Sequence, residues 1–267
     1  MEKALRADTW FDRLAELVKT LRSDRGCPWD RAQTPEKIKD YLLEEAYEVL
    51  DALERGSPKE VCSELGDLLF HIAFLAALYE ERGKFCLDDV VRGIVEKMIR
   101  RHPHVFGEAR VDSVADVRAQ WRAVKAAEAS QQGQDPALHL DAVPASLPAL
   151  MRAYRVKERA ATEGLAHYDA KGTVFEIEER LAEFSRALTC GQDEICEKAL
   201  GDLLLAVVEL GRQGGVHSET ALRRSTGRFI HTCRCVVQGL REQGQTVETA
   251  SDRELDRAWK ACKGEKR

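Results

Sequence analysis

The chain has little of several features that mark particular classes of protein. Aromatic residues make up only 6% of its 267 residues, and alternating strand-like patterns are nearly absent, while helix signals dominate. No apolar run approaches the ~20 residues of a membrane span, and residues 1–10 are too polar for a signal peptide. The formal net charge of −5 provides no overall basic field. We therefore expect an all-α protein that binds neither nucleic acid nor a membrane.

The eight cysteines also lack a recognisable framework. No two of them form a C-x-x-C pair, and Cys233 and Cys235 form a lone C-x-C, which is weak evidence for a metal site. Scattered cysteines of this kind are typical of reduced thiols. We therefore expect the protein to be cytoplasmic.

What the sequence does contain is two groups of acidic residues inside apolar stretches with helical periodicity. Glu44, Glu45 and Glu48 lie in the first stretch, and Glu64 and Asp67 lie in the second. Like charges three or four residues apart destabilise an isolated helix, but a cation between two helices would offset that cost. Carboxylate oxygens suit Mg²⁺ or Mn²⁺. The alternative is a solvated acidic face, although such a face ordinarily mixes signs, and no Lys or Arg stands four residues from these acids.

The spacing at 100° per residue places each acidic group beside a core-facing seam. The apolar stripes are Leu42, Ala46, Val49 and Leu53 on the first helix, and Val61, Leu65, Leu68 and Ile72 on the second. The short connection at residues 56–58 favours antiparallel packing through these stripes. Such packing would let the acids converge on one pocket.

Local signals predict where the helices begin and end. A cap and a proline at Thr34-Pro35 open the first acidic helix, and the capping box at residues 57–60 opens the second, which runs toward Gly83. A third helix is predicted from about Leu87 to Arg101, and Ser113 can cap a fourth. The Gln-, Gly- and Pro-rich segment at 131–145 is interpreted as a linker between domains at 1–130 and 146–267.

The second domain repeats the pattern of the first. The string at residues 65–69 recurs unchanged at 200–204, Glu44-Glu45 recurs as Glu178-Glu179, and Trp121 recurs as Trp259. The offset drifts from 134 to 138, as small loop insertions would cause. Three features in one order indicate a duplication.

In this alignment the second copy has lost part of its acidic set. Ala182 stands where Glu48 stood and Ala199 stands where Glu64 stood, while Glu178, Glu179 and Asp202 remain. Because a divalent site needs several oxygen ligands, the second repeat is predicted to bind metal weakly and to be structural or regulatory.

Three motifs in this order resemble those of the MazG family of nucleoside triphosphate pyrophosphohydrolases. They are Cys-Pro-Trp-Asp at 27–30, the Glu-Glu-x-x-Glu and Glu-x-x-Asp groups at 44–48 and 64–67, and the basic helix end with His-Pro-His-Val-Phe at 97–106. The likeness runs over nearly the whole chain, as in tandem-domain members. It implies four-helix-bundle repeats, a homodimer, and Mg²⁺-dependent cleavage of nucleoside triphosphates between the α and β phosphates. Housekeeping of the nucleotide pool is the expected role.

The resemblance also implies roles for individual residues. Glu45, Glu48, Glu64 and Asp67 would be metal ligands, and Glu44 would line the same pocket and assist catalysis. Lys97 and Arg101, four residues apart on one helix, would hold the phosphates, and Trp121 would contact substrate. Because the complete acidic set is in the first repeat, we expect the active site there.

Several alternatives remain open from the residues alone. Lys97 and Arg101 could simply compensate a helix dipole, and Trp121 could be a packing residue. His71 is interpreted as supporting the acidic site or facing solvent rather than as a metal ligand. Other candidate functions are a di-iron oxidase, disfavoured because no Glu-x-x-His occurs here, and a non-catalytic nucleotide sensor or helical interaction protein.

Overall fold

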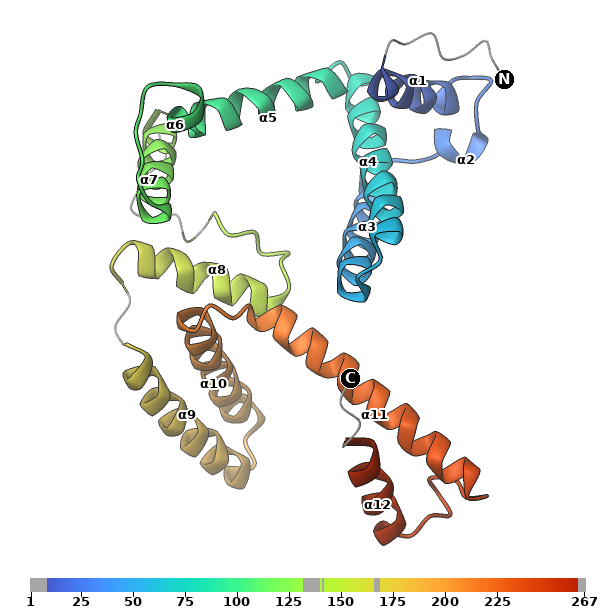
Figure 1. Ribbon diagram of the computed structural model, residues 1–267, viewed down its shortest axis with the longest axis vertical. Coiled ribbons are helices and arrows are strands. Elements are labelled where there is room, and N and C mark those ends of the chain that lie inside the picture. The colour runs from blue at the N-terminus through green and yellow to red at the C-terminus, as the bar shows by residue number, and fades with distance from the viewer. Residues whose placement is uncertain (1–8, 132–139, 141, 166–168, 264–267) are drawn as a thin grey trace. The chain divides into compact units, whose positions relative to one another are not determined.

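The structure is a computed structural model that describes residues 9–131, 140, 142–165 and 169–263. These residues form twelve helices and no strand, which confirms the all-α prediction (Figure 1). Their contacts divide the chain into two units that meet in sequence between Glu128 and Ala129. The linker expected at 131–145 lies largely outside the described residues.

The first unit contains seven helices. They are α1 (Trp10–Arg22), α2 (Pro28–Arg31), α3 (Pro35–Arg55), α4 (Pro58–Glu80), α5 (Leu87–Arg101), α6 (Pro103–Phe106) and α7 (Val114–Gln131). The predicted bounds of α5 are confirmed, and so is the start of α3. The helices α1, α2 and α6 were not anticipated. Two of them have only four residues, and the cap of α1 at Thr9, whose side chain accepts from the Asp12 backbone N–H, was overlooked.

The pair α3 and α4 forms an antiparallel hairpin (Figure 1). Pro35 occupies the first turn of α3, and the helix ends at Gly56, whose φ of 72° lies in the left-handed region that glycine adopts without strain. The Ser57 side chain accepts a hydrogen bond of 3.3 Å from the Glu60 backbone N–H, which caps α4. This tight connection fixes which residues of the two helices face each other.

The core of the first unit lies at the C-terminal half of α4, where α1 and the start of α3 pack against it. It consists of Val18, Ile38, Ala73, Phe74, Ala76, Ala77, Leu78 and Leu87. The acidic residues of α3 and α4 lie nearer the hairpin loop, outside this core. The core therefore holds one end of the hairpin rigidly while the acidic end remains accessible.

By length and composition, α4 is apolar enough to cross a membrane, which the sequence reading did not anticipate. Its 23 residues include an 18-residue window with a mean hydropathy of 1.7. The core helix of a globular unit meets the same criterion, and α4 supplies five of the buried core residues. Glu64 and Asp67 also lie within it. One such helix is weak evidence for a membrane span.

Beyond the hairpin, α5 leaves the far end of α4 instead of packing along α3 (Figure 1). The short α6 follows it, and α7 is capped by Ser113, whose hydroxyl accepts from the Asp116 backbone N–H at 3.1 Å. This cap is the one the sequence predicted for the fourth helix.

The second unit repeats this order of helices. It contains α8 (Ala149–Thr162), α9 (Ala170–Cys190), α10 (Asp193–Gln213), α11 (Ser218–Glu242) and α12 (Asp252–Lys263). The hairpin of α9 and α10 corresponds to that of α3 and α4, and α8 packs on α10 as α1 packs on α4. Gly191, with φ of 65°, ends α9 as Gly56 ends α3.

The helix bounds correct the alignment of the two repeats. The offset is 135 residues both at the first hairpin helix (170 minus 35) and at the second (193 minus 58). It also pairs fully buried Ile38 with fully buried Thr173, and Ala52 with Ala187. The offset of 134 that matched Glu44-Glu45 to Glu178-Glu179 is therefore wrong by one residue. The two-residue match of Glu44-Glu45 to Glu178-Glu179 was a weaker guide to the alignment than the helix caps and the buried positions.

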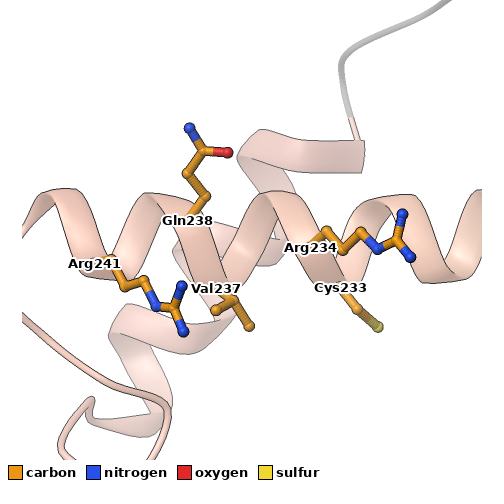
Figure 2. Close-up of a pocket in the computed structure, with 5 residues that line it drawn as sticks. All are labelled: Cys233, Arg234, Val237, Gln238 and Arg241. Atoms are coloured by element: carbon orange, nitrogen blue, oxygen red, sulfur yellow. The ribbon is translucent and has the colours of Figure 1, made fainter.

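The cysteines differ from expectation in one pair. Cys235 on α11 and Cys262 on α12 form a disulfide with 6.0 Å between their Cα atoms. Packing of α11 against α12 brings them together, which a separation of 27 residues in sequence could not reveal. Cys233, the other half of the C-x-C pair, is a free thiol. It lines a shallow hollow on α11 that contains none of the predicted site residues (Figure 2).

Candidate metal centre

Three of the predicted ligands come together between α3 and α4. One carboxylate oxygen from each of Glu45, Glu48 and Glu64 lies within 4.8 Å of the others. Glu45 and Glu48 lie one turn apart on α3, and Glu64 faces them from α4. Three hard oxygen donors from two helices, at this spacing, fit a divalent cation such as Mg²⁺ or Mn²⁺.

The electrostatics of the group show how closely these acids interact. Partial burial is the largest cause of a raised pKa of the Glu64 carboxyl. The negative charges of Glu48, Asp67 and Glu45 raise that pKa further, and a hydrogen bond with Glu48 adds to the effect. A carboxyl that resists ionisation because of like-charged neighbours is in a place where a cation would be stabilised.

The other two predicted acids lie at the edge of this group. Asp67 is exposed one turn after Glu64 and is close enough to shift the Glu64 pKa. Glu44 is exposed on α3 beside Glu45 and is not part of the three-carboxylate group. The structure therefore places three of the other four acids close enough to Glu64 to raise its pKa.

His71, interpreted from the sequence as supporting the acidic site or facing solvent, lies against the site. Its Nε2 atom lies 3.4 Å from Oε1 of Glu45, and the two side chains are only 13% and 18% exposed. The imidazole thus contacts the carboxylate from α4, where His71 lies one turn beyond Asp67. It is outside the three-residue group that could hold an ion.

The predicted phosphate-binding residues form a separate group on α5 and α7. Arg101 donates to Glu128 Oε2 from Nη2 at 2.5 Å, and its guanidinium carbon lies 5.3 Å from the centre of the Trp121 ring. Arg100 donates to the other Glu128 oxygen at 2.8 Å. Lys97 is exposed one turn earlier on α5. Glu128 therefore neutralises part of this basic surface within the same chain.

A single copy of the chain does not bring the basic group to the carboxylates. At about 1.5 Å per residue, the thirteen residues from Asp67 to Glu80 span about 20 Å of α4, and the ten from Leu87 to Lys97 span about 15 Å of α5. Because α5 turns away from the hairpin, it does not run back toward the carboxylates (Figure 1). The basic residues therefore lie far from the carboxylates of the same hairpin.

Comparisons with known proteins agree with the motifs. Residues 33–106 match the model of the MazG nucleotide pyrophosphohydrolase domain. The chain is 36% identical, over 254 residues, to the "Nucleoside triphosphate pyrophosphohydrolase/pyrophosphatase MazG" of Thermotoga maritima, covering 95% of this chain and 96% of the relative. It is 37% identical, over 262 residues, to a nucleoside triphosphate pyrophosphohydrolase of Escherichia coli K12, covering 95% and 97%. The chain belongs to the MazG family.

Among solved structures, a MazG-related protein from Thermotoga maritima is 28% identical to part of the chain. The match covers 43% of this chain and 97% of the Thermotoga chain, with a TM-score of 0.38. The matched MazG domain at 33–106 includes the five acids together with Lys97 and Arg101. It ends before Trp121, and it does not extend into the second unit.

The corresponding place in the second unit has fewer acids and gains a cation. With the offset of 135, Arg180 stands at the position of Glu45 and Ala199 at that of Glu64. The Arg180 guanidinium donates to Glu183 at 2.9 Å and lies 3.9 Å from Glu176. The Arg180 side chain therefore supplies a positive charge beside the acidic residues of α9.

A second cation acts on the remaining ligand position of this repeat. Lys198 donates to Asp202 at 2.8 Å, and this hydrogen bond is the largest cause of the lowered pKa of the Asp202 carboxyl, to which the Arg180 charge also contributes. Asp202 corresponds to Asp67. The residues of the incomplete acidic set are corrected: Glu183, not Ala182, stands at the position of Glu48, and Arg180 replaces Glu45. Weak metal binding by the second unit stays a prediction.

The sequence alone did not reveal two residues and one contact that shape these sites. Glu128 was overlooked because it lies outside the acidic groups, although it stands seven residues after Trp121 on the same helix. Arg180 was hidden by the one-residue alignment error. His71 was noticed, but its contact with Glu45 depends on how α3 and α4 pack, which spacing on one helix does not give.

Proposed function

We propose that this chain hydrolyses nucleoside triphosphates to a nucleoside monophosphate and pyrophosphate, with Mg²⁺ or Mn²⁺ held at the first unit. The observation that carries the proposal is the convergence of Glu45, Glu48 and Glu64 within 4.8 Å, inside the segment that matches the MazG domain. The names of the two long relatives support this substrate class.

The residues divide the chemistry between them. Glu45, Glu48, Glu64 and Asp67 would hold the metal, which when bound neutralises the charge of the triphosphate and activates the attacking water. Glu44, exposed beside the group, is positioned to accept a proton from that water. Cleavage between the α and β phosphates follows if the carboxylates hold the metal at the α phosphate.

The basic residues would act from a second copy of the chain. Arg101 can bind phosphate oxygens bidentately and Lys97 can act as a point charge, but neither lies near the carboxylates of its own hairpin. A homodimer in which α5 of one copy packs on the hairpin of the other would bring them together. Arg101 would then exchange its bond to Glu128 for one to substrate.

Unpartnered apolar surface supports such a dimer. Leu43, Leu53 and Leu65 on the hairpin are each at least half exposed. On α5 an apolar hollow is lined by Ile94, Val95, Met98, Ile99 and Phe106. Surfaces of this kind on a water-exposed hairpin are usually covered by another protein surface, and a second copy supplies the same complementary pair by symmetry.

The first unit is the one we propose to be active. Its site has four interacting carboxylates, whereas in the second unit Arg180 and Lys198 neutralise the remaining acids. The second unit would then serve as a structural or regulatory repeat. We further propose a cytoplasmic protein with a housekeeping role in the nucleotide pool.

The test is a panel of nucleoside triphosphates incubated with the full-length protein and Mg²⁺, followed by separation of the products. Monophosphate and pyrophosphate in equal amounts are expected, with no turnover in EDTA. Diphosphate and orthophosphate would show that the wrong bond was assigned. Nucleotide binding without turnover would favour the alternative of a non-catalytic nucleotide sensor.

A further inference from the structure

His71 contacts the candidate metal site without belonging to it. Its Nε2 atom is 3.4 Å from Oε1 of Glu45, across the interface between α4 and α3. Because a carboxylate can only accept, the proton of the imidazole must be on Nε2 for this contact to be favourable. The Nδ1 atom is buried and has no hydrogen-bond partner among the described residues. Within the part of the chain that the structure describes, the contact to Glu45 is therefore the polar contact available to orient the ring.

Aromatic neighbours fix the position of the His71 ring. Tyr41, one turn before Glu45 on α3, stacks on it with 5.7 Å between ring centres and 10° between planes. Phe70 meets it edge-on at 5.5 Å. Tyr41 in turn contacts Trp29 of α2 at 6.0 Å. A ring held on two sides in this way cannot follow Glu45 if the carboxylate moves, so it constrains the carboxylate instead.

The second repeat gives an independent observation within the same chain. At the offset of 135, Glu45 is replaced by Arg180, His71 by Ala206, and Tyr41 by Glu176. All three members of the group are therefore absent together, and Glu176 now lies 3.9 Å from the Arg180 guanidinium. Where there is no carboxylate to orient, there is neither the imidazole nor the tyrosine that holds it.

We propose that His71 is a positioning residue that orients the Glu45 carboxylate toward the divalent cation, with Tyr41 holding the imidazole in place. The inference rests on the proposed function, because it takes Glu45 as a metal ligand. By holding Oε1, the imidazole would leave the other carboxylate oxygen available to the cation. Partners behind a ligand typically change metal affinity by about 10- to 100-fold when removed.

The experiment measures Mn²⁺ binding to the full-length protein by electron paramagnetic resonance, without nucleotide. His71→Phe keeps the ring and its stacking on Tyr41 but removes the Nε2–H donor. His71→Gln places an amide N–H near the former Nε2 position. Glu45→Ala removes the ligand itself. His217→Phe is the matched control, because His217 stacks on Tyr154 in the second unit with 4.1 Å between ring centres.

The expected result is a weakening of Mn²⁺ binding by about 10- to 100-fold in His71→Phe, a smaller loss in His71→Gln, and none in His217→Phe. In activity assays, His71→Phe should need more Mg²⁺ for half-maximal rate but approach the wild-type kcat at saturating Mg²⁺. A role limited to packing would not produce this rescue by excess metal.

Different failures separate the two proposals. If Glu45→Ala weakens Mn²⁺ binding and His71→Phe does not, the positioning role is wrong and the metal site stands. Equal losses in His71→Phe and His71→Gln, accompanied by equal drops in melting temperature, would also overturn the positioning role. If Glu45→Ala binds Mn²⁺ as the wild type does, the metal site and the positioning role are both overturned.

Discussion

Single charged residues determine how α5 and α7 hold together. Glu128 accepts hydrogen bonds from Arg101 and Arg100, which lower the pKa of its carboxyl to about 2. Its ordinary pKa is 4.5, so the folded state favours the ionised form. Glu128 therefore stabilises the fold above pH 4.5, and this contribution is lost as the pH falls from 4.5 toward about 2.

The direction of this pH dependence of stability can be tested with Glu128→Gln. The variant should melt at a lower temperature than the wild type at pH 7, and the difference should shrink at pH 4 and shrink further at pH 3, because protonation removes the same ion pair from the wild type. Thermal unfolding followed by circular dichroism measures it. Glu108→Gln changes an exposed carboxyl on the loop after α6 and serves as the control. Its unfolding free energy should lie within about 0.5 kcal/mol of the wild-type value. A constant difference at all pH values would contradict the assignment.

Much of the residue-level site could be predicted from the sequence, for a definite reason. The five acids stand out because like charges at helical spacing inside apolar stretches are costly, and that pattern is visible without a structure. The contacts of His71 with Glu45 and of Glu128 with Arg101 join residues 26 and 27 positions apart (71 minus 45 and 128 minus 101). Such contacts depend on helix packing, and no pattern on one helix reveals them.

At the scale of elements, the first helices of the two hairpins, α3 and α9, each have 21 residues and each end at a glycine in the left-handed conformation. Gly191 ends α9 with φ of 65°, and an added Cβ there would meet no other atom within 4 Å. Gly191→Ala should therefore cost only the left-handed strain, about 1–2 kcal/mol of unfolding free energy. Gly201→Ala, in the interior of α10 and equally open, should instead stabilise by up to about 1 kcal/mol.

Denaturant unfolding of the two glycine variants measures whether their unfolding free energies change in opposite directions. Because neither new methyl group would touch a neighbour, the comparison isolates backbone conformation from packing. No loss of stability in Gly191→Ala would contradict the left-handed cap at that position, and a loss in Gly201→Ala would contradict the helix-interior prediction for Gly201.

The register of the second hairpin is testable by rebuilding its metal site. In a Glu48→Ala background, which weakens the first site, the double substitution Arg180→Glu with Ala199→Glu should raise Mn²⁺ affinity. It removes the internal cation and supplies carboxylates at the positions of Glu45 and Glu64. The pair Ala182→Glu with Ala199→Glu, which follows the offset of 134 at α9, should gain much less because Arg180 remains.

Calorimetry with Mn²⁺ distinguishes these variants. A greater gain from the Ala182→Glu pair would show that the offset of 135 is wrong at α9. The sequence located this repeat through residues 200–204 but misplaced α9 by one residue. Short identities on exposed helix faces are not constrained by the core, whereas the buried pair Ala52 and Ala187 is.

At the scale of the whole molecule, the proposed association of two copies is our explanation for the separation of the acidic and basic groups. The apolar faces of α3, α4 and α5 remain exposed in one chain. Sedimentation at low micromolar concentration should therefore give twice the 30.0 kDa chain mass. Ile94→Asp, in the apolar hollow of α5, should shift the protein toward monomer and reduce turnover together. A fully active monomer would contradict the shared site.

The central claim is that the first repeat carries the catalytic carboxylates, and one matched pair of variants tests it most directly. Full-length wild type, Glu48→Ala and Glu183→Ala, which change the same position in the two repeats, are assayed for release of pyrophosphate from nucleoside triphosphate with Mg²⁺. Glu48→Ala should lose activity by about 100-fold or more, because a metal ligand is worth several kcal/mol to the transition state. Glu183→Ala should keep most of it. Full activity in Glu48→Ala, or loss in Glu183→Ala alone, would contradict the assignment.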